Sequence, residues 1–245
     1  MEVIESAANR RIKEWAKLQK KKERDRTGRF LAEGEHLTEE AIAAGLAEVI
    51  LTDHPEDYEF EPKIQVPFFI LEKLSSSVSG VHTIAVCRMK EEETSPAEKI
   101  LVLDGVQDPG NLGTLIRTAL SFGYERIVCS PDTVDLYNDK VLRSTQGSLF
   151  HISVIRTELV PYLRRLKDEG MPVLATSLHK AAALQSYTYR GPHALILGNE
   201  GNGVSEAVLA ESDVCLKIEM DRFESLNVAA AGAILMYELH GYGKS

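Results

Sequence analysis

The sequence predicts two α/β domains, a small one followed by a larger one built on a mostly parallel sheet. From residue 100 onward, short apolar runs alternate with helix-like stretches, and this alternation is typical of parallel strands joined by helices. The first 90 residues hold a shorter α/β pattern, and the charged segment 90–99 has the composition of a linker. We therefore expect one domain over residues 1–92 and a second over residues 98–245.

The first domain begins with a predicted helix over residues 5–22, whose apolar side carries Ile12. A second helix is expected over residues 34–44, because Gly45 is a natural stop for it. The apolar runs in this domain predict strands at residues 29–33, 48–52, 64–71 and 83–89. Pro67 lies inside the third run, which is therefore an edge strand or is divided at the proline.

The second domain alternates regularly between the two kinds of element. Its strands are predicted at residues 100–104, 126–129, 152–155, 172–176, 194–198 and 214–218. Its helices are predicted at residues 111–122, 138–146, 157–169, 203–210 and 225–240. Ligands of open parallel sheets bind beyond the carboxyl ends of the strands, so the segments that follow the strands are the candidates for a functional site.

The net charge of −9 conceals a strongly basic segment near the start of the chain. Residues 10–29 carry a net charge of +7, which leaves −16 for the rest of the chain. A basic block on an acidic body fits a surface that binds phosphates, and a solvated helix face explains it equally well. The candidate nucleic-acid contacts in this segment are Arg10, Arg11, Lys20, Lys21, Lys22, Arg24 and Arg29.

Several classes of protein are disfavoured by what the sequence lacks. No apolar run approaches the roughly 18 residues of a membrane span, and no secretory signal is recognisable. The cysteines Cys87, Cys129 and Cys215 lie far apart, which fits a reducing cytoplasm. The histidines are scattered, and no cysteine or histidine pair has ligand spacing, so we expect no metal site. The G-x-G-x-x-G fingerprint of dinucleotide binding is absent.

Three segments of the second domain carry the polar residues and glycines from which a site is built. Segment 103–117 places Asn111 and Arg117 at a helix start, which fits an anion site or simply a capped helix. Segment 195–205 is glycine-rich, which suits close approach of a ligand to bare backbone or a long turn. Segment 218–235 begins polar and turns abruptly small and apolar, as a structural helix start also does.

Together and in this order, the three segments resemble the SpoU (TrmH-like) family of RNA 2′-O-ribose methyltransferases, within the SPOUT superfamily. Asn111, Gly113 and Arg117 are similar to its N-x-G-x-x-x-R motif, and residues 197–201 to its L-G-x-E-G motif. Residues 225–228 are similar to its closing S-L-N-V motif. The resemblance covers the whole second domain. The first domain also resembles the family's N-terminal RNA-binding domain.

The resemblance implies an enzyme that binds S-adenosylmethionine and methylates RNA, ribosomal rather than transfer RNA. It also implies a homodimer and a trefoil knot in the second domain. The implied catalytic residues are Arg117, Asn111, Ser225, Asn227 and Glu200. The implied cofactor-binding residues are Thr176, Ser177, Leu197, Gly198, Asn199, Gly201, Ile218, Met220 and Leu226. Arg143, in a segment that resembles another part of the family, joins the candidate RNA contacts.

Two positions depart from the family pattern, and several alternatives stay open. Glu219 stands where members usually have proline, and Glu224 where glycine is common. The first alternative is a non-catalytic RNA-binding relative, against which the intact motif residues argue. The others are a transfer-RNA 2′-O-methyltransferase and a base methyltransferase on the same scaffold.

Overall fold

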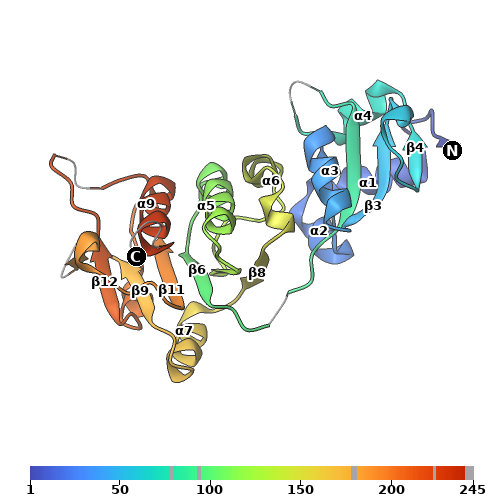
Figure 1. Cartoon of the computed structure of the whole chain (residues 1–245). Helices are drawn as coiled ribbons and strands as arrows, with labels where there is room; N and C mark the ends of the chain where they lie inside the picture. The colour runs from blue at the N-terminus through green and yellow to red at the C-terminus, as the bar shows by residue number, and fades with distance from the viewer. Residues whose placement is uncertain (78–79, 93–94, 178–180, 223–224, 241–245) are drawn as a thin grey trace. The chain divides into compact units, whose positions relative to one another are not determined.

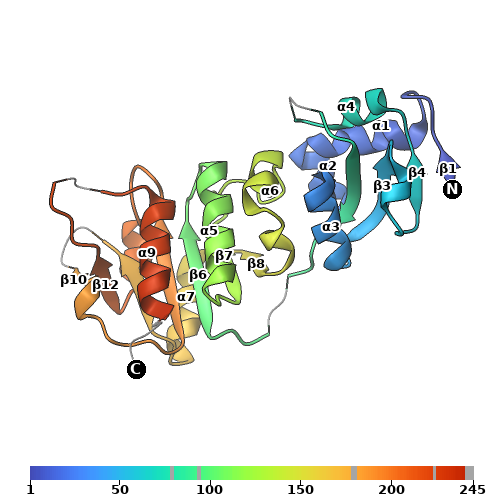
Figure 2. The same ribbon diagram turned by 45° about the horizontal axis from the view of Figure 1, so that its top comes forward.

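The computed structural model describes residues 1–77, 80–92, 95–177, 181–222 and 225–240 (Figure 1 and Figure 2). The chain forms two compact units. The first unit comprises residues 1–91 together with 135–151, and the second comprises residues 92–134 and 152–245. The sequence pattern did not anticipate that segment 135–151 packs with the first unit.

The first unit is built on a mixed sheet of strand order β1-β4-β3-β5-β2. The strands are β1 (Glu2–Val3), β2 (Arg29–Glu33), β3 (Ala47–Thr52), β4 (Lys63–Gln65) and β5 (Thr83–Arg88). The helices are α1 (Arg10–Ala16), α2 (Lys21–Thr27), α3 (Glu35–Ala43), α4 (Phe68–Leu74) and, from the later segment, α6 (Asp139–Thr145). Helices α1 and α4 share a core with one face of the sheet, and α3 packs on strands β2, β3 and β5 (Figure 2).

Two predictions for this unit are wrong in part. The helix expected over residues 5–22 is shorter, because the Asn9 side chain accepts a hydrogen bond from the Arg11 N–H and starts α1 there. A 3₁₀ turn (Lys17–Gln19) then separates α1 from α2. The run at 64–71 is a strand only up to Gln65, and α4 begins directly after Pro67. Its buried residues Ile70, Leu71 and Leu74 have helical spacing, which the apolar run concealed.

The second unit contains a sheet of strand order β10-β12-β9-β11-β6-β7-β8, and every pairing between described neighbours is parallel. Its strands are β6 (Lys99–Asp104), β7 (Arg126–Cys129), β8 (Ser153–Arg156), β9 (Val173–Thr176), β10 (Ala182–Ala183), β11 (His193–Gly198) and β12 (Val214–Lys217). Its helices are α5 (Pro109–Ser121), α7 (Leu159–Asp168), α8 (Glu206–Leu209) and α9 (Val228–His240). The predicted parallel α/β fold is confirmed. The two-residue β10 had no signal in the sequence.

Helices cover both faces of this sheet, as the continuous apolar strands require. Alternate residues such as Val102 and Ile196 share a core with Leu163 of α7. On the opposite face, a Cβ added to Gly232 of α9 would lie 2.5 Å from Leu115 of α5 and 2.8 Å from Leu197 of β11. The small residue therefore lets α9 pack closely on α5 and the sheet, which positions the start of α9 beside the strand ends. The trefoil knot stays a prediction. In the described part of the chain, no helix has both the length and the apolar character of a membrane span.

Candidate active site

The first and second motif segments leave the sheet side by side. Strands β6 and β11 are parallel neighbours, and their last residues Asp104 and Gly198 are paired. After β6, Gly105 turns the chain in a left-handed conformation with φ of +72°. Asp108 then caps α5, because its Oδ1 accepts a hydrogen bond of 2.8 Å from the Asn111 N–H. Both segments are therefore held at one edge of the sheet.

A single carboxylate joins these two segments. Glu200 accepts hydrogen bonds from the backbone N–H groups of Gln107 (3.1 Å) and Asp108 (3.0 Å). It also accepts one of 3.0 Å from Nδ2 of Asn111. Three donors converge on this carboxylate, so Glu200 fixes the loop after β6 against the loop after β11.

The third motif segment is connected through Asn227. Its Nδ2 donates to Oδ1 of Asn111 over 2.8 Å. Its own Oδ1 accepts hydrogen bonds from the N–H groups of Ala229 (2.9 Å) and Ala230 (3.2 Å), which caps α9. The chain of contacts Glu200–Asn111–Asn227, called here the motif network, therefore links all three motif segments in one place.

The motif network also sets the ionisation of Glu200. Partial burial alone would raise the pKa of this carboxyl, but hydrogen bonds from Asn111, Asp108 and Gln107 outweigh burial and lower the pKa below its ordinary 4.5. The carboxylate is therefore charged at neutral pH. Its role is to accept hydrogen bonds, and it holds no proton to donate.

We expect Glu200→Gln to destabilise the second unit at neutral pH by on the order of 1 kcal/mol, because an exposed charged acceptor is replaced by one amide oxygen. The lowered pKa means that the stabilisation is present above pH 4.5 and is lost as the pH falls through the lowered value. Urea unfolding of wild type and Glu200→Gln, at pH 7 and below pH 4, measures the difference in their unfolding free energy at each pH. Glu206→Gln, on the exposed start of α8, is the control. Equal stability of Glu200→Gln and wild type at pH 7 would contradict the network's role.

The backbone of the glycine-rich loop is hydrogen-bonded within the loop itself and is not left open to a ligand. Oδ1 of Asn199 accepts hydrogen bonds from the N–H groups of Gly201 (2.9 Å) and Asn202 (3.1 Å), and its Nδ2 donates to the Gly105 carbonyl (2.8 Å). A Cβ added to Gly198 would lie 2.0 Å from the carbonyl carbon of Gly203. The close approach that requires glycine at position 198 is thus made by the chain's own backbone.

Most of the predicted cofactor-binding residues lie at the ends of three adjacent strands. Strand β9 lies between β12 and β11 in the sheet. Thr176 ends β9 and Ser177 follows it, Gly198 ends β11, and Ile218 directly follows β12. Oγ1 of Thr176 donates to the Ile196 carbonyl (3.3 Å), which ties β9 to β11. These residues share one edge, and their binding role stays a prediction.

Other predicted residues stand apart from the motif network. Arg117 lies on the exposed side of α5, and its side chain makes no hydrogen bond or ion pair with any described residue. It follows Asn111 by about 1.7 helical turns, so the two side chains leave α5 in different directions. Ser225 and Leu226 are exposed just before α9, and Glu219 is exposed after β12. Glu224 lies outside the described residues.

The sequence reasoning missed residues that support the loops. Oδ2 of Asp104, at the end of β6, accepts a hydrogen bond of 2.7 Å from the Ser205 N–H. The Ser130 Oγ accepts one of 2.9 Å from the Gly105 N–H. Asp108 was recognisable as an N-cap, because it directly precedes Pro109 at the helix start. The other two contacts depend on the strand order, which the sequence does not specify.

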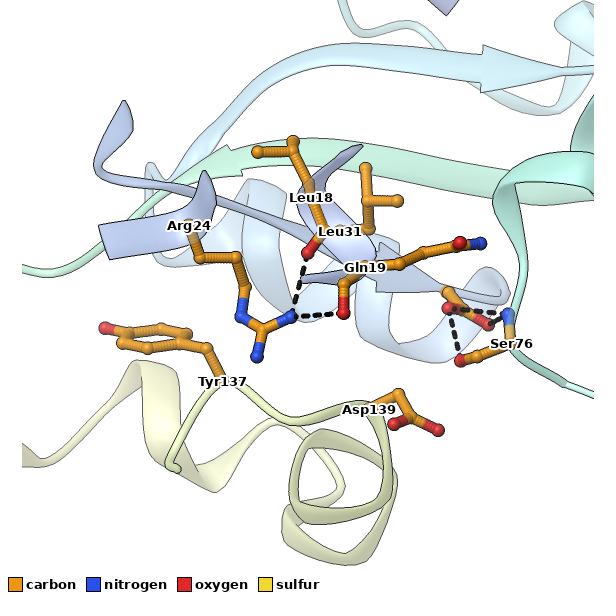
Figure 3. A pocket seen from close by; sticks show the side chains of 8 residues that line it. Leu18, Gln19, Arg24, Leu31, Ser76, Tyr137 and Asp139 are labelled. Atoms are coloured by element: carbon orange, nitrogen blue, oxygen red, sulfur yellow. Dashed lines mark hydrogen bonds between the residues drawn. The ribbon is translucent and has the colours of Figure 1, made fainter. Parts of the chain in front are cut away.

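The basic segment of the first unit is mixed in character. Arg24 is corrected from a surface base to a buried residue that donates to the carbonyls of Leu18 (2.8 Å) and Gln19 (3.0 Å) and pairs with Asp135. Figure 3 shows its guanidinium in a small pocket beside Tyr137. Lys20 and Lys22 are exposed. The other candidates form ion pairs, namely Arg10–Glu14, Arg11–Glu2, Lys21–Asp25, Arg29–Glu48 and Arg143–Asp139.

Known families match both parts of the chain. A model of the SpoU rRNA methylase family matches residues 98–237, and a model of the MRM3-like substrate binding domain matches residues 9–85. Together with the parallel sheet and the motif network, these matches define an RNA methyltransferase. More particularly, the chain belongs to the SpoU rRNA methylase family.

Similar proteins span essentially the whole chain. It is 46% identical, over 98% of its own length and all of the relative, to the 23S rRNA (guanosine(2553)-2′-O)-methyltransferase RlmP of Bacillus subtilis (strain 168). An AdoMet-bound rRNA methyltransferase from Sinorhizobium meliloti matches with a TM-score of 0.88 and 27% identity, covering 99% of each chain. An RNA 2′-O ribose methyltransferase matches with a TM-score of 0.82 and 33% identity, covering 97% of each chain.

Proposed function

We propose that this enzyme methylates the ribose 2′-hydroxyl of one guanosine in 23S ribosomal RNA. The chain is an S-adenosylmethionine-dependent RNA methyltransferase of the SpoU family. The motif network carries the proposal, because it joins Asn111, Glu200 and Asn227 at the sheet edge where a ligand of this fold is expected. The relative that is 46% identical acts on guanosine 2553 of 23S rRNA, which supports the equivalent nucleotide as the substrate.

The residues at the strand ends fit S-adenosylmethionine. Ile218 and Met220 offer partly covered apolar surface, and Leu226 is 41% exposed. Thr176, the last residue of β9, and Ser177, which follows it, add hydroxyl groups. A mixed apolar and polar edge suits a ligand with a flat base and charged groups. When bound, this cofactor supplies a methyl group on a positively charged sulfur, and the sulfur leaves as a neutral thioether.

The protein's own task is to position the ribose, and the proton of the 2′-hydroxyl passes to water as the oxygen takes the methyl group. Arg117 is the candidate that contacts RNA, because its guanidinium is exposed and makes no bond to another described side chain. A guanidinium stays protonated in proteins and is a poor base, so Arg117 grips a phosphate and polarises the 2′-hydroxyl. Asn111, Asn227 and Ser225 orient the nucleotide. Glu200 holds the loop after β6 against the loop after β11. Positioning of reactants lowers a reaction barrier by on the order of 7–11 kcal/mol in favourable cases.

The finer features of this proposal concern assembly and substrate recognition. We infer that residues 1–92 form a domain that binds RNA through its exposed bases, among them Lys20 and Lys22. Residues 98–245 form the catalytic domain. Two copies of the chain form a homodimer that places Arg117 near a cofactor site, since Arg117 lies outside the motif network. The ribosomal substrate places the reaction in the cytoplasm.

The substrate is tested by mapping 2′-O-methyl groups in 23S rRNA from cells with and without the gene. We expect one methylated guanosine to disappear, at the position equivalent to the relative's 2553, and to return when the purified enzyme and S-adenosylmethionine are added. A methyl group found on a base, or on transfer RNA alone, would support one of the alternative activities and overturn the proposal.

A further inference from the structure

A cluster of two histidines and a carboxylate lies in the first unit, far along the chain from the motif segments. Asp53 and His54 directly follow strand β3, and His82 directly precedes strand β5. These strands are antiparallel neighbours that pair Thr52 with Thr83. The sheet thus brings together two histidines 28 residues apart in sequence, which no ligand-spacing rule detects.

The backbone around this cluster is held in place by hydrogen bonds through two buried threonines. The Asp53 N–H donates to the His82 carbonyl over 3.3 Å, and the hydroxyl of Thr52 donates to the same carbonyl over 3.0 Å. The Thr52 hydroxyl also accepts from the His54 N–H (3.1 Å) and from the Thr83 hydroxyl (3.0 Å). Thr52 and Thr83 are buried, so the positions of the three clustered residues are set by the sheet.

The side chains converge on a common point. Nδ1 of His82 lies 2.9 Å from Oδ2 of Asp53, and Nε2 of His54 lies 3.8 Å from Oδ1 of the same carboxylate. One ligand atom from each residue lies within 4.8 Å of the others. Ligand atoms of a tetrahedral ion, at about 2.0–2.2 Å from the metal, are on the order of 3.4 Å apart. Small side-chain adjustments therefore suffice to close the three atoms around an ion.

A fourth residue, a carboxylate, lies close to the second ring nitrogen of one of the histidines. Nδ1 of His54, the ring nitrogen that does not face Asp53, lies 3.6 Å from Oε1 of Glu56. Metal-bound histidines commonly present their second nitrogen to a carboxylate, which fixes the ring and its tautomer. The Glu56 carboxylate is thus placed to leave Nε2 of His54 available as a ligand.

We propose that Asp53, His54 and His82 bind a zinc ion, with water completing the coordination shell. Two imidazole nitrogens and one carboxylate oxygen are a donor set that Zn²⁺ accepts, whereas Mg²⁺ and Ca²⁺ prefer oxygen ligands alone. The side chains of His54 and His82 are 52% and 53% exposed, so water reaches the open positions. The ion would cross-link the end of β3 to the start of β5. It takes no part in methyl transfer.

The test uses the full-length chain stripped of metal with a chelator and titrated with Co²⁺, which reports nitrogen and oxygen coordination by visible absorption. We expect absorption that saturates at one ion per chain and is removed by Zn²⁺. His54→Ala and His82→Ala should each abolish the saturable signal, whereas His36→Ala, an exposed histidine of the same unit, should titrate as wild type. Absence of saturable binding in wild type would overturn the proposal, as would unchanged titration of either cluster variant.

Two further measurements separate metal binding from folding. Asp53→Asn keeps the size of the side chain but removes its charge, so it should weaken the saturable Co²⁺ binding, and unchanged binding would overturn the proposal. Circular dichroism establishes whether each variant is folded. Glu56→Gln should weaken Zn²⁺ binding by about tenfold without removing it, because it acts through His54. Unchanged affinity in this variant would overturn the assignment of Nε2 of His54 as the ligating atom. In wild type, Zn²⁺ should raise the melting temperature and Mg²⁺ should leave it unchanged.

Discussion

Replacing Arg117 by alanine should slow methyl transfer by about two to three orders of magnitude, the usual effect of removing one charge-stabilising donor from an active site. The affinity for S-adenosylmethionine should change by less than about twofold. The physical reason is the position of the side chain. Arg117 is exposed and lacks a bonding partner within the described chain, so its removal costs little stability and leaves the strand-end residues intact.

The measurement pairs single-turnover methylation of a 23S rRNA fragment with calorimetry of cofactor binding. Arg164→Ala is the matched control, because Arg164 is an exposed arginine of the same unit that pairs with Glu211 over 2.8 Å. Arg117→Lys keeps the charge but loses the planar fork, so it should recover only part of the rate. Full activity of Arg117→Ala would remove this residue from the mechanism, and lost cofactor binding would assign it a different role.

The sequence predicted the sheet of the second unit well because its strands are continuous apolar runs between amphipathic helices. The helix predicted over residues 157–169 appears as α7, and the strand at 126–129 appears with the same bounds. The prediction from the apolar pattern was wrong where a run read as a strand belongs to a helix, as at Ile70 and Leu71 of α4. A short run of apolar residues fits a buried strand or a helix equally well.

The candidate site was predictable only in its parts. The motif residues were recognisable singly, but the bond between Glu200 and Asn111 joins residues 89 apart, and it exists because β6 and β11 are neighbours. Strand order follows from packing of the whole chain and has no local signal. The burial of Arg24 was missed for the same reason, since its partner Asp135 lies 111 residues away. Long-range pairing therefore limits what a single sequence reveals.

The largest structural effect is expected from Gly198→Ala. A Cβ at this position would lie 2.0–2.3 Å from the backbone atoms of Gly203 and Val204, and backbone cannot rotate away as a side chain can. We expect the second unit to lose about 3 kcal/mol or more of unfolding free energy. Its melting temperature should fall by about 6 °C or more.

Substitutions at two other glycines of the same loop distinguish the effect of steric overlap from the effect of backbone strain. A Cβ at Gly201 would have its nearest neighbour, Oδ1 of Asn199, at an ordinary 3.5 Å, so Gly201→Ala should barely change stability. Gly203 has open space around it but a φ of +69°, so Gly203→Ala should cost about 1–2 kcal/mol through strain alone. Thermal unfolding should therefore rank Gly198→Ala as most damaging, followed by Gly203→Ala and then Gly201→Ala.

The glycine variants should rank differently in their affinity for S-adenosylmethionine than in their stability, and that difference tests the proposed site. Gly198→Ala should lose S-adenosylmethionine binding because the loop between β11 and α8 can no longer close. Gly201→Ala keeps the loop, so any loss of affinity in this variant reports a direct contact with the cofactor. If Gly198→Ala melted like wild type, the close approach of residue 198 to the backbone of Gly203 would be absent in solution. The loop would then have to bind the cofactor in another conformation.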